Sequence, residues 1–286
     1  CKGGVILTAS HNPKEYNGYK AYWDDGSQLV PPHDKNVIDE VKKVQVSDIK
    51  FEGVPEMITI LGKDFDKKYL DKVKTLSLSP EAIQKEHDLK IVFTPLHGTT
   101  YELVPASLRN WGFTNIHTVP EQSIPDGDFP TVASANPEEP AAFKMALDLA
   151  RKIDADLAMA CDPDGDRIGI AVKNDAGEWT LLNGNQTNII FTEYIIRRKK
   201  ELNQLKGGEY TVKTIVTTEL IKDIAEKNHI ICYDVYTGFK WIADVIRKEG
   251  GEKFIGGGEE SFGYMPGAFT RDKDGVSATS LMAEIA

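Results

Sequence analysis

Two rounds of alternating strand-like and helix-like segments follow one another along the chain from residue 87 onward. In the first round we expect strands at 89–93, 115–119, 157–160 and 168–172, with helices at 101–111 and 140–153. In the second we expect helices at 186–200, 217–227 and 237–248, with strands at 211–216, 229–233 and 253–255. Such alternation is typical of βα units, whose strands form sheets covered by helices. The fold class we predict is therefore α/β, with tandem similar α/β domains and mixed, mostly parallel sheets.

The first part of the chain has a different pattern. A strand-like run at 4–7 is followed by a polar loop at 8–13. Asn17-Gly18 is a hairpin turn signal before a second strand-like stretch at 19–23, and a helix is expected to begin at Pro31-Pro32. We interpret this part as the end of a further domain that precedes the two repeated ones.

These patterns predict three domains within the 286 residues. The expected boundaries are 1–70, 71–182 and 183–286, with a charged helix at 64–74 acting as a connector. The chain has no initiator Met and ends inside a helical pattern at 278–286. We therefore expect it to be a piece of a longer protein.

The loop between the strands at 157–160 and 168–172 carries the densest group of functional side chains. Asp162, Asp164 and Asp166 occupy alternate positions, and their negative charges repel one another unless a cation neutralises them. A hard divalent ion with oxygen ligands, Mg²⁺ for preference, suits such a loop. The spacing does not fit an EF-hand, whose turn glycine would fall at the following arginine. A solvated acidic turn is the alternative.

Ser10 lies in the polar loop after the first strand. The sequence around it lacks the glycines of a serine-hydrolase elbow, and the adjacent His11 is not expected to turn back and act as a base. A phosphoserine at this position would add an oxygen ligand for a metal held by the aspartates. An ordinary loop serine is the alternative.

A glycine-rich segment, GGGEES at 256–261, follows the expected strand at 253–255. It lacks the lysine of a nucleotide-binding P-loop, and its two glutamates would repel phosphates. Carboxylates beside a hydroxyl suit a neutral ligand rich in hydroxyl groups, such as a sugar; a capped helix start is the alternative. Like Ser10 and the acidic loop, this segment follows a strand, and ligands of α/β proteins collect beyond the carboxyl ends of strands.

Composition excludes several classes of partner. The net charge of −10 argues against a general nucleic-acid or membrane binder, since both need a basic surface. No apolar run approaches the length of a membrane span. Cys1, Cys161 and Cys232 are odd in number and far apart, so we expect no disulfide framework and a cytoplasmic location.

Together, the segments TASHNP at 8–13, DPDGDR at 162–167 and GEES at 258–261 resemble the phosphoserine, metal and sugar-specificity loops of the α-D-phosphohexomutases. They occur in the order typical of that family. Further similar segments are YNGYK at 16–20, TPLHG at 94–98, TGFK at 237–240 and RDKDG at 271–275. The resemblance covers essentially the whole chain and is closest in character to bacterial α-phosphoglucomutases and phosphopentomutase-like members.

The resemblance implies a four-domain fold, of which residues 1–70 would be the C-terminal part of domain 1, 71–182 domain 2 and 183–286 domain 3, with the phosphate-binding domain 4 absent. It also implies roles for individual side chains. The implied metal ligands are Ser10, Asp162, Asp164 and Asp166, with Mg²⁺ as cofactor. The implied catalytic residues are Ser10, His11, Lys20 and Arg167, and the implied substrate-binding residues are Thr237, Gly238, Lys240, Glu259 and Ser261.

The activity implied is that of a phosphoglucomutase-type isomerase, an intramolecular phosphotransferase. Phosphoserine 10 would convert glucose 1-phosphate to glucose 1,6-bisphosphate, which reorients and returns its other phosphate, releasing glucose 6-phosphate. Phe262 and its neighbours stand where phosphomannomutase-type members carry a His, which favours glucose over mannose and leaves the general acid and base undetermined. We expect the chain alone to be nearly inactive, because the phosphate-binding domain is absent.

Other functions stay open on the same residues. A phosphomannomutase, a phosphopentomutase or a glucose 1,6-bisphosphate synthase would use the same loops. A haloacid-dehalogenase-like phosphatase would use Asp162 as its nucleophile, and a metal-binding module would use the acidic loop without catalysis. His97 is expected to stabilise its own loop at least as readily as to line a domain interface.

Overall fold

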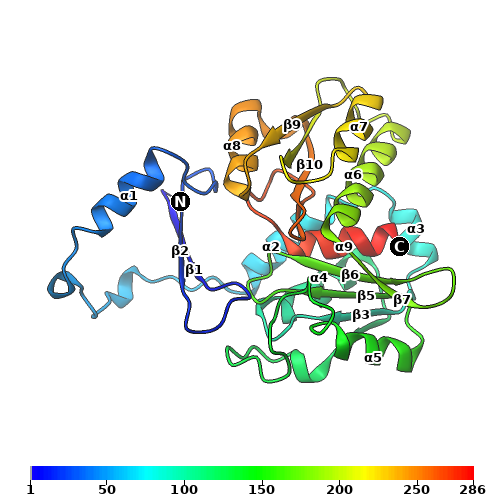
Figure 1. The fold of residues 1–286 in the computed structure, drawn as a ribbon, viewed down its shortest axis with the longest axis horizontal. Coiled ribbons are helices and arrows are strands. Elements are labelled where there is room, and N and C mark those ends of the chain that lie inside the picture. Colours follow the sequence, from blue (N-terminus) through cyan, green and yellow to red (C-terminus); the bar gives the residue numbers. More distant parts are fainter. Residues whose placement is uncertain (1) are drawn as a thin grey trace.

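The computed structural model describes residues 2–286, so Cys1 lies outside the described part. It contains a five-stranded sheet, a four-stranded sheet and a two-stranded hairpin (Figure 1). The described helices and strands confirm the α/β class and the mixed sheets. No helix within residues 2–286 has both the length and the apolar character needed to cross a membrane.

The five-stranded sheet has the order β4-β3-β5-β6-β7. Strands β4, β3 and β5 are parallel, whereas β6 and β7 are antiparallel additions at one edge. Helix α5 packs on one face against β3 and β5, and α4 connects β3 to β4. The bounds are β3 Ile91–Thr94, α4 Leu103–Trp111, β4 Ile116–Thr118, α5 Lys144–Ile153, β5 Leu157–Cys161, β6 Ile168–Lys173 and β7 Trp179–Leu182.

The four-stranded sheet has the order β11-β10-β8-β9, with β10, β8 and β9 parallel and β11 antiparallel to β10. Helices α6 and α7 pack against each other, α6 also contacts β10, and α8 contacts β8, β9 and β10. The bounds are α6 Gly184–Glu201, β8 Tyr210–Thr214, α7 Leu220–Lys227, β9 Ile231–Val235, α8 Phe239–Glu249, β10 Phe254–Glu259 and β11 Gly263–Met265.

Helix α9, Gly275–Ile285, lies between the two sheets and joins them (Figure 1). Its residues are buried as far as Glu284, and it contacts α4, α6, β5, β6 and β11. Helices α2, Lys63–Lys74, and α3, Pro80–Lys85, also contact it. One hydrophobic cluster therefore includes side chains from both sheets, such as Phe93 of β3 and Tyr264 of β11.

Two backbone hydrogen bonds tie the acidic loop to the second sheet. The amide of Ile168 donates to the carbonyl of Phe262 at 3.0 Å, and the amide of Gly275 donates to the carbonyl of Gly165 at 2.9 Å. The start of β6 and the middle of the acidic loop are thus held by the turn after β10 and by the first residue of α9.

The N-terminal segment projects from these two units (Figure 1). It consists of β1, Gly4–Thr8, paired with β2, Gly18–Tyr22, and of α1, His33–Val41. Helix α1 has no buried residue, and β1 is exposed over most of its length. Side-chain contacts, described below, hold this segment to the rest of the protein.

Two of our local predictions are wrong. Asn17-Gly18 does not form a tight turn: Gly18 pairs with Thr8, and the connection runs through residues 9–17. A glycine suits this position because a Cβ on Gly18 would lie 2.5 Å from the carbonyl oxygen of Thr8. The helix expected at 217–227 begins later, because α7 starts at Leu220 with Glu219 as its N-cap.

The structure of the glycine-rich segment at 256–261 also differs from our prediction. Residues 256–259 belong to β10 and are buried, and the chain then turns into β11 instead of a helix. A Cβ on Gly258 would lie 1.8 Å from the Asn188 side chain, so the absence of a side chain allows α6 to approach the strand. Strand β11 and helix α3 were not predicted. The remaining predicted strands and helices are present, with bounds that differ by a few residues.

Candidate functional site

The structure brings Ser10 and the acidic loop together. The hydroxyl of Ser10 donates to Oδ2 of Asp162 at 2.8 Å, although 152 positions separate them. Thr8 connects the same two loops, because its hydroxyl accepts from the amide of Ser10 at 2.8 Å and donates to Oδ2 of Asp164 at 3.0 Å. The serine loop is therefore held against the acidic loop by side chains from both β1 and its following turn.

The acidic loop has the donors that a hard cation requires. One carboxylate oxygen from each of Asp162, Asp164 and Asp166 lies within 4.8 Å of the others. Oδ1 of Asp164 and Oδ1 of Asp166 are buried and have no hydrogen-bond partner among residues 2–286. Burial, followed by the charge of Asp162, raises the pKa of Asp164 to about 6. A divalent cation would occupy the unpartnered oxygens and relieve this repulsion, so the residues fit a metal site.

Asp162 also organises the loop. It is fully buried, and its Oδ1 accepts from the amides of Asp166 at 3.1 Å and Arg167 at 3.0 Å. Gly165 lies between these residues with a φ of 76°, in the left-handed region that favours glycine. This explains why a glycine separates the second and third aspartates.

His11 differs from our expectation. We expected an adjacent histidine not to reach back to the serine, but Nδ1 of His11 lies 3.1 Å from the Ser10 hydroxyl. The φ of Ser10 is 51°, an uncommon value for a residue with a side chain, and this local turn accompanies the contact. His11 Nδ1 also lies 3.9 Å from Asp162, so the ring is within reach of both groups.

Three cations surround the acidic loop. Nζ of Lys20, on β2, lies 3.7 Å from Asp166, and Nζ of Lys273 lies 2.9 Å from the same carboxylate. The guanidinium of Arg167 forms an ion pair with Glu138. Lys20 and Arg167 are two of the catalytic residues that the resemblance implies, whereas no role was predicted for Lys273.

Glu259 lies at the end of β10, with its side chain largely buried. Burial raises the pKa of Glu259, although the hydrogen bond from the amide of Gly238 partly opposes this. That bond is 2.6 Å long and connects the sugar-loop candidate to the turn before α8. Lys273 and Arg167 are close enough to influence the same carboxyl group, so the charges of the acidic loop extend to Glu259.

The other substrate-binding candidates are more dispersed. Ser261 is partly buried in the turn between β10 and β11, and Thr237 is exposed. Lys240, in the first turn of α8, forms an ion pair with Asp34 of α1 at 3.2 Å. It is thus engaged with the N-terminal segment rather than with the acidic loop.

Two residues beside the site were missed by local patterns. Lys273 belongs to the RDKDG segment at 271–275, whose familial character was noted without a role for its lysine. Its neighbour Asp272 accepts from the hydroxyl of Tyr22 at 2.8 Å, so this segment also holds the hairpin. Glu138 lies on the long connection between β4 and α5, and no sequence motif there indicated a functional residue. By contrast, His97 bonds within its own region, to Thr131 at 2.8 Å, as an ordinary loop histidine does.

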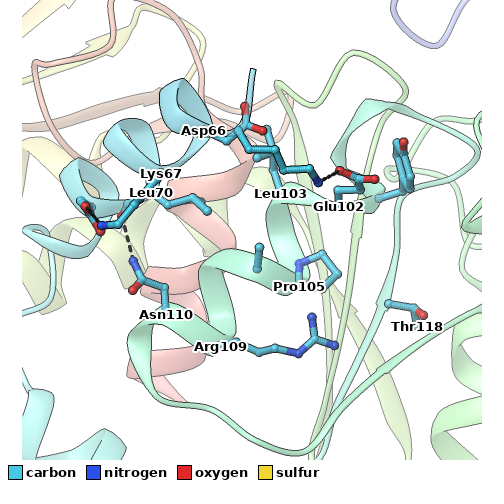
Figure 2. Close-up of a pocket in the computed structure, with 13 residues that line it drawn as sticks. Asp66, Lys67, Leu70, Glu102, Leu103, Pro105, Arg109, Asn110 and Thr118 are labelled. Atoms are coloured by element: carbon cyan, nitrogen blue, oxygen red, sulfur yellow. Dashed lines mark hydrogen bonds and ion pairs between the residues drawn. The ribbon is translucent and has the colours of Figure 1, made fainter. Parts of the chain in front are cut away.

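A cavity of about 600 Å³ between α2 and α4 is separate from this site (Figure 2). Its lining combines apolar side chains such as Leu70 with charged ones such as Arg109. Lys63 and Glu102 pair at 3.2 Å on its border. None of the predicted site residues lines it, so we assign it no part in the chemistry.

Comparison with known proteins gives three family matches along the chain. They are the phosphoglucomutase/phosphomannomutase alpha/beta/alpha domains I, II and III, which match residues 1–47, 67–177 and 183–286. A phosphomannomutase of Mycoplasmoides pirum is 37% identical over 288 residues, covering 99% of this chain and 52% of that protein. A phosphoglucomutase of Staphylococcus aureus strain MRSA252 is 37% identical over 287 residues, covering 99% and 51%.

The fold is also found in solved structures. A putative phosphomannomutase from Thermus thermophilus aligns with a TM-score of 0.79 at 23% identity, covering 99% of this chain and 59% of that one. The chain spans about half the length of the curated relatives it matches. The two relatives carry different substrate names at the same identity, so similarity alone does not separate glucose from mannose.

Proposed function

The chain belongs to the phosphoglucomutase/phosphomannomutase family, and from this premise we propose that it is the part of a hexose phosphate mutase that carries the phosphoserine, metal and sugar loops. The reaction is the interconversion of hexose 1-phosphate and hexose 6-phosphate through a bisphosphate intermediate. Glucose 1-phosphate, glucose 6-phosphate and glucose 1,6-bisphosphate are the proposed substrates and intermediate. A cytoplasmic location stays a prediction.

The observation that supports this proposal most strongly is the 2.8 Å contact between the Ser10 hydroxyl and Asp162. A phosphoryl group on Ser10 would bring further negative charge to a carboxylate cluster, which is favourable only if a cation balances it. Asp162, Asp164 and Asp166 would hold Mg²⁺, with an oxygen of the phosphorylated Ser10 as an additional ligand. When bound, Mg²⁺ supplies positive charge that favours phosphoryl transfer.

The chain's own residues provide the rest of the charge balance. In the first half of the reaction, Oγ of Ser10 is the leaving oxygen and a sugar hydroxyl oxygen is the attacking one. Lys20 and Arg167 stabilise the negative charge of the transferring group. His11, whose Nδ1 lies 3.1 Å from the Ser10 hydroxyl oxygen, would give a proton to that oxygen as its bond to phosphorus breaks, and the sugar hydroxyl would release its proton to water as its oxygen bonds to phosphorus. The second half reverses these roles after the intermediate has turned.

Residues at the end of the second sheet would orient the sugar. Glu259 would accept hydrogen bonds from sugar hydroxyls, because a carboxylate can accept from two donors at once. Ser261 would donate a hydrogen bond to a sugar hydroxyl or accept one from it. The Gly238 amide fixes one oxygen of Glu259 and leaves the other for a ligand. Thr237 and Lys240 would contribute at the edge of the site, the latter after leaving its pair with Asp34.

Phosphopeptide mapping and activity assays test this function. The purified natural protein is expected to carry a phosphoryl group on Ser10, and to convert glucose 1-phosphate faster than mannose or ribose 1-phosphate. Ser10→Ala should abolish both the modification and the turnover, whereas Ser47→Ala, at an exposed position after α1, should leave both unchanged. Phosphate on Asp162 instead of Ser10 would favour a haloacid-dehalogenase-like phosphatase, and metal binding without phosphoserine would favour a non-catalytic module.

A further inference from the structure

Glu138 is joined to the acidic loop through Arg167. One oxygen of its carboxylate accepts from Nη1 of the Arg167 guanidinium, and both side chains are largely shielded from solvent. The two residues come from different elements, because Glu138 lies before α5 and Arg167 lies directly before β6. The pair therefore links a long connection of the first sheet to the end of the proposed metal loop.

The connection is built to hold Glu138 in place. The amide of Glu138 donates to the side chain of Asn136 at 3.1 Å, and the amide of Glu139 donates to the Asn136 carbonyl at 3.0 Å. This is an Asx turn, which fixes the direction of the following residues. The turn also packs tightly on β6, because a Cβ on Gly169 would lie 2.8 Å from the carbonyl of Pro137. Glu138 is thus presented by a rigid turn.

Arg167 itself is fixed at two points and free at a third. Its amide donates to Asp162, and its Nη1 donates to Glu138. Its Nε is buried and has no hydrogen-bond partner among residues 2–286. A buried guanidinium N–H without a protein partner is costly, and a bound anion would supply the missing acceptor.

Without Glu138, other carboxylates would compete for this cation. Arg167 adjoins Asp166 in the sequence, and it lies close enough to Glu259 for its charge to oppose in part the rise in the pKa of that carboxyl group that burial causes. If the guanidinium turned toward Asp166 or Glu259, it would no longer face the phosphoryl group. It would also neutralise a carboxylate that is proposed to bind the metal or the sugar. Arginine forms directional, planar hydrogen bonds, so one well-placed acceptor sets the plane of the whole group.

We propose that Glu138 is a positioning residue, which orients the Arg167 guanidinium so that its remaining N–H groups face the transferring phosphoryl group. This inference rests on the function proposed above. It assigns a role to the turn at 136–139, which is joined to the acidic loop by the ion pair of Glu138 with Arg167.

A double-mutant cycle in the natural protein tests it. Glu138→Ala should lower kcat by about tenfold or more with little change in KM, since small displacements of a positioned group cost rate rather than affinity. Glu138→Gln keeps an acceptor oxygen and should stay within about threefold of the wild type. Glu139→Ala is the matched control, because Glu139 belongs to the same turn and accepts from the Ser134 hydroxyl instead of from Arg167. In an Arg167→Ala background, Glu138→Ala should have no further effect.

Chemical rescue separates positioning from loop stability. Added guanidinium should restore part of the activity of Arg167→Ala, because Glu138 still offers its binding place, and should fail to restore Arg167→Ala/Glu138→Ala. Equal losses in Glu138→Ala and Glu139→Ala, or additive losses with Arg167→Ala, would overturn the inference. An inactive wild-type protein would instead overturn the proposed function.

Discussion

The ammonium group of Lys273 lies 2.9 Å from the carboxylate of Asp166. Lys273 precedes Asp274, the N-cap of α9, and so belongs to the second sheet's side of the molecule, whereas Asp166 belongs to the loop after β5. Burial raises the pKa of Asp166, and the charge of Lys273 opposes that effect. Of the two lysines that the structure describes beside this carboxylate, Lys273 is therefore the nearer, and its charge favours the ionised form.

Lys273→Met should impair the reaction strongly. Loss of the cation leaves Asp166 with Lys20 alone, at 3.7 Å, and removes positive charge beside the proposed phosphoryl position. We expect kcat to fall by about tenfold to a hundredfold in a coupled glucose 6-phosphate assay. Lys273→Arg should retain more activity than Lys273→Met, and Lys68→Met, on the exposed face of α2, serves as the control. Wild-type rates in Lys273→Met would contradict the prediction.

Magnesium should stabilise the folded protein. A ligand that binds only the native state adds about 2.7 kcal/mol when its concentration is a hundred times its Kd, which raises the melting temperature. Differential scanning calorimetry with and without Mg²⁺ should show this increase, and EDTA should reverse it. Asp164→Asn should remove most of the increase, while Asp175→Asn, on the exposed turn between β6 and β7, should not. An increase of the same size in Asp164→Asn would place the ion elsewhere.

Glu259 should give substrate affinity a pH dependence. Because burial raises the pKa of Glu259, this carboxyl group takes up a proton at a higher pH than an exposed glutamate does. The neutral form is a poorer acceptor for sugar hydroxyls, so KM for the sugar phosphate should increase as the pH falls through that raised pKa. Glu259→Gln should have a high KM that no longer changes over this range. If KM changed with pH in the same way in the wild type and in Glu259→Gln, the pH dependence would not come from Glu259.

Asp274 should matter for stability. One of its carboxylate oxygens accepts from the amide of Val276 at 3.0 Å and from the Tyr69 hydroxyl at 2.7 Å, and thereby caps α9 and attaches α2. Asp274→Ala should lower the free energy of unfolding by about 2 kcal/mol in urea titrations. Asn is also a good cap, so Asp274→Asn should lose less. Equal losses for Ala and Asn would indicate that the cap contributes little.

The sequence identified those parts of the fold that depend on local pattern. The apolar runs before and after the acidic loop form β5 and β6, because alternation of short apolar stretches with helices reflects burial along the chain. Clustered aspartates predict a metal site, and a phosphoserine would supply a further oxygen ligand to that metal, so the residue types alone related Ser10 to the acidic loop. Their contact across 152 positions agrees with that interpretation.

What escaped prediction depends on partners distant in sequence. Gly258 looked like part of a loop because glycine is a turn signal, but the close approach of Asn188 requires a glycine within a strand. Asn17-Gly18 looked like a turn for the same reason. Lys273 and Glu138 are ordinary charged residues in sequence, and only the packing of α9 and of the turn at 136–139 brings them beside the acidic loop.

The two backbone hydrogen bonds that tie the acidic loop to Phe262 and Gly275 limit how this protein can be recombined with its relatives. Exchanging residues 183–286 for the equivalent stretch of a homologue would replace Phe262 and Gly275. The residues that they bond, Ile168 and Gly165, would remain those of the original chain. A functional chimera would therefore have to reproduce two main-chain contacts that side-chain design cannot repair. The hairpin, which is attached through side chains, is the segment more readily exchanged.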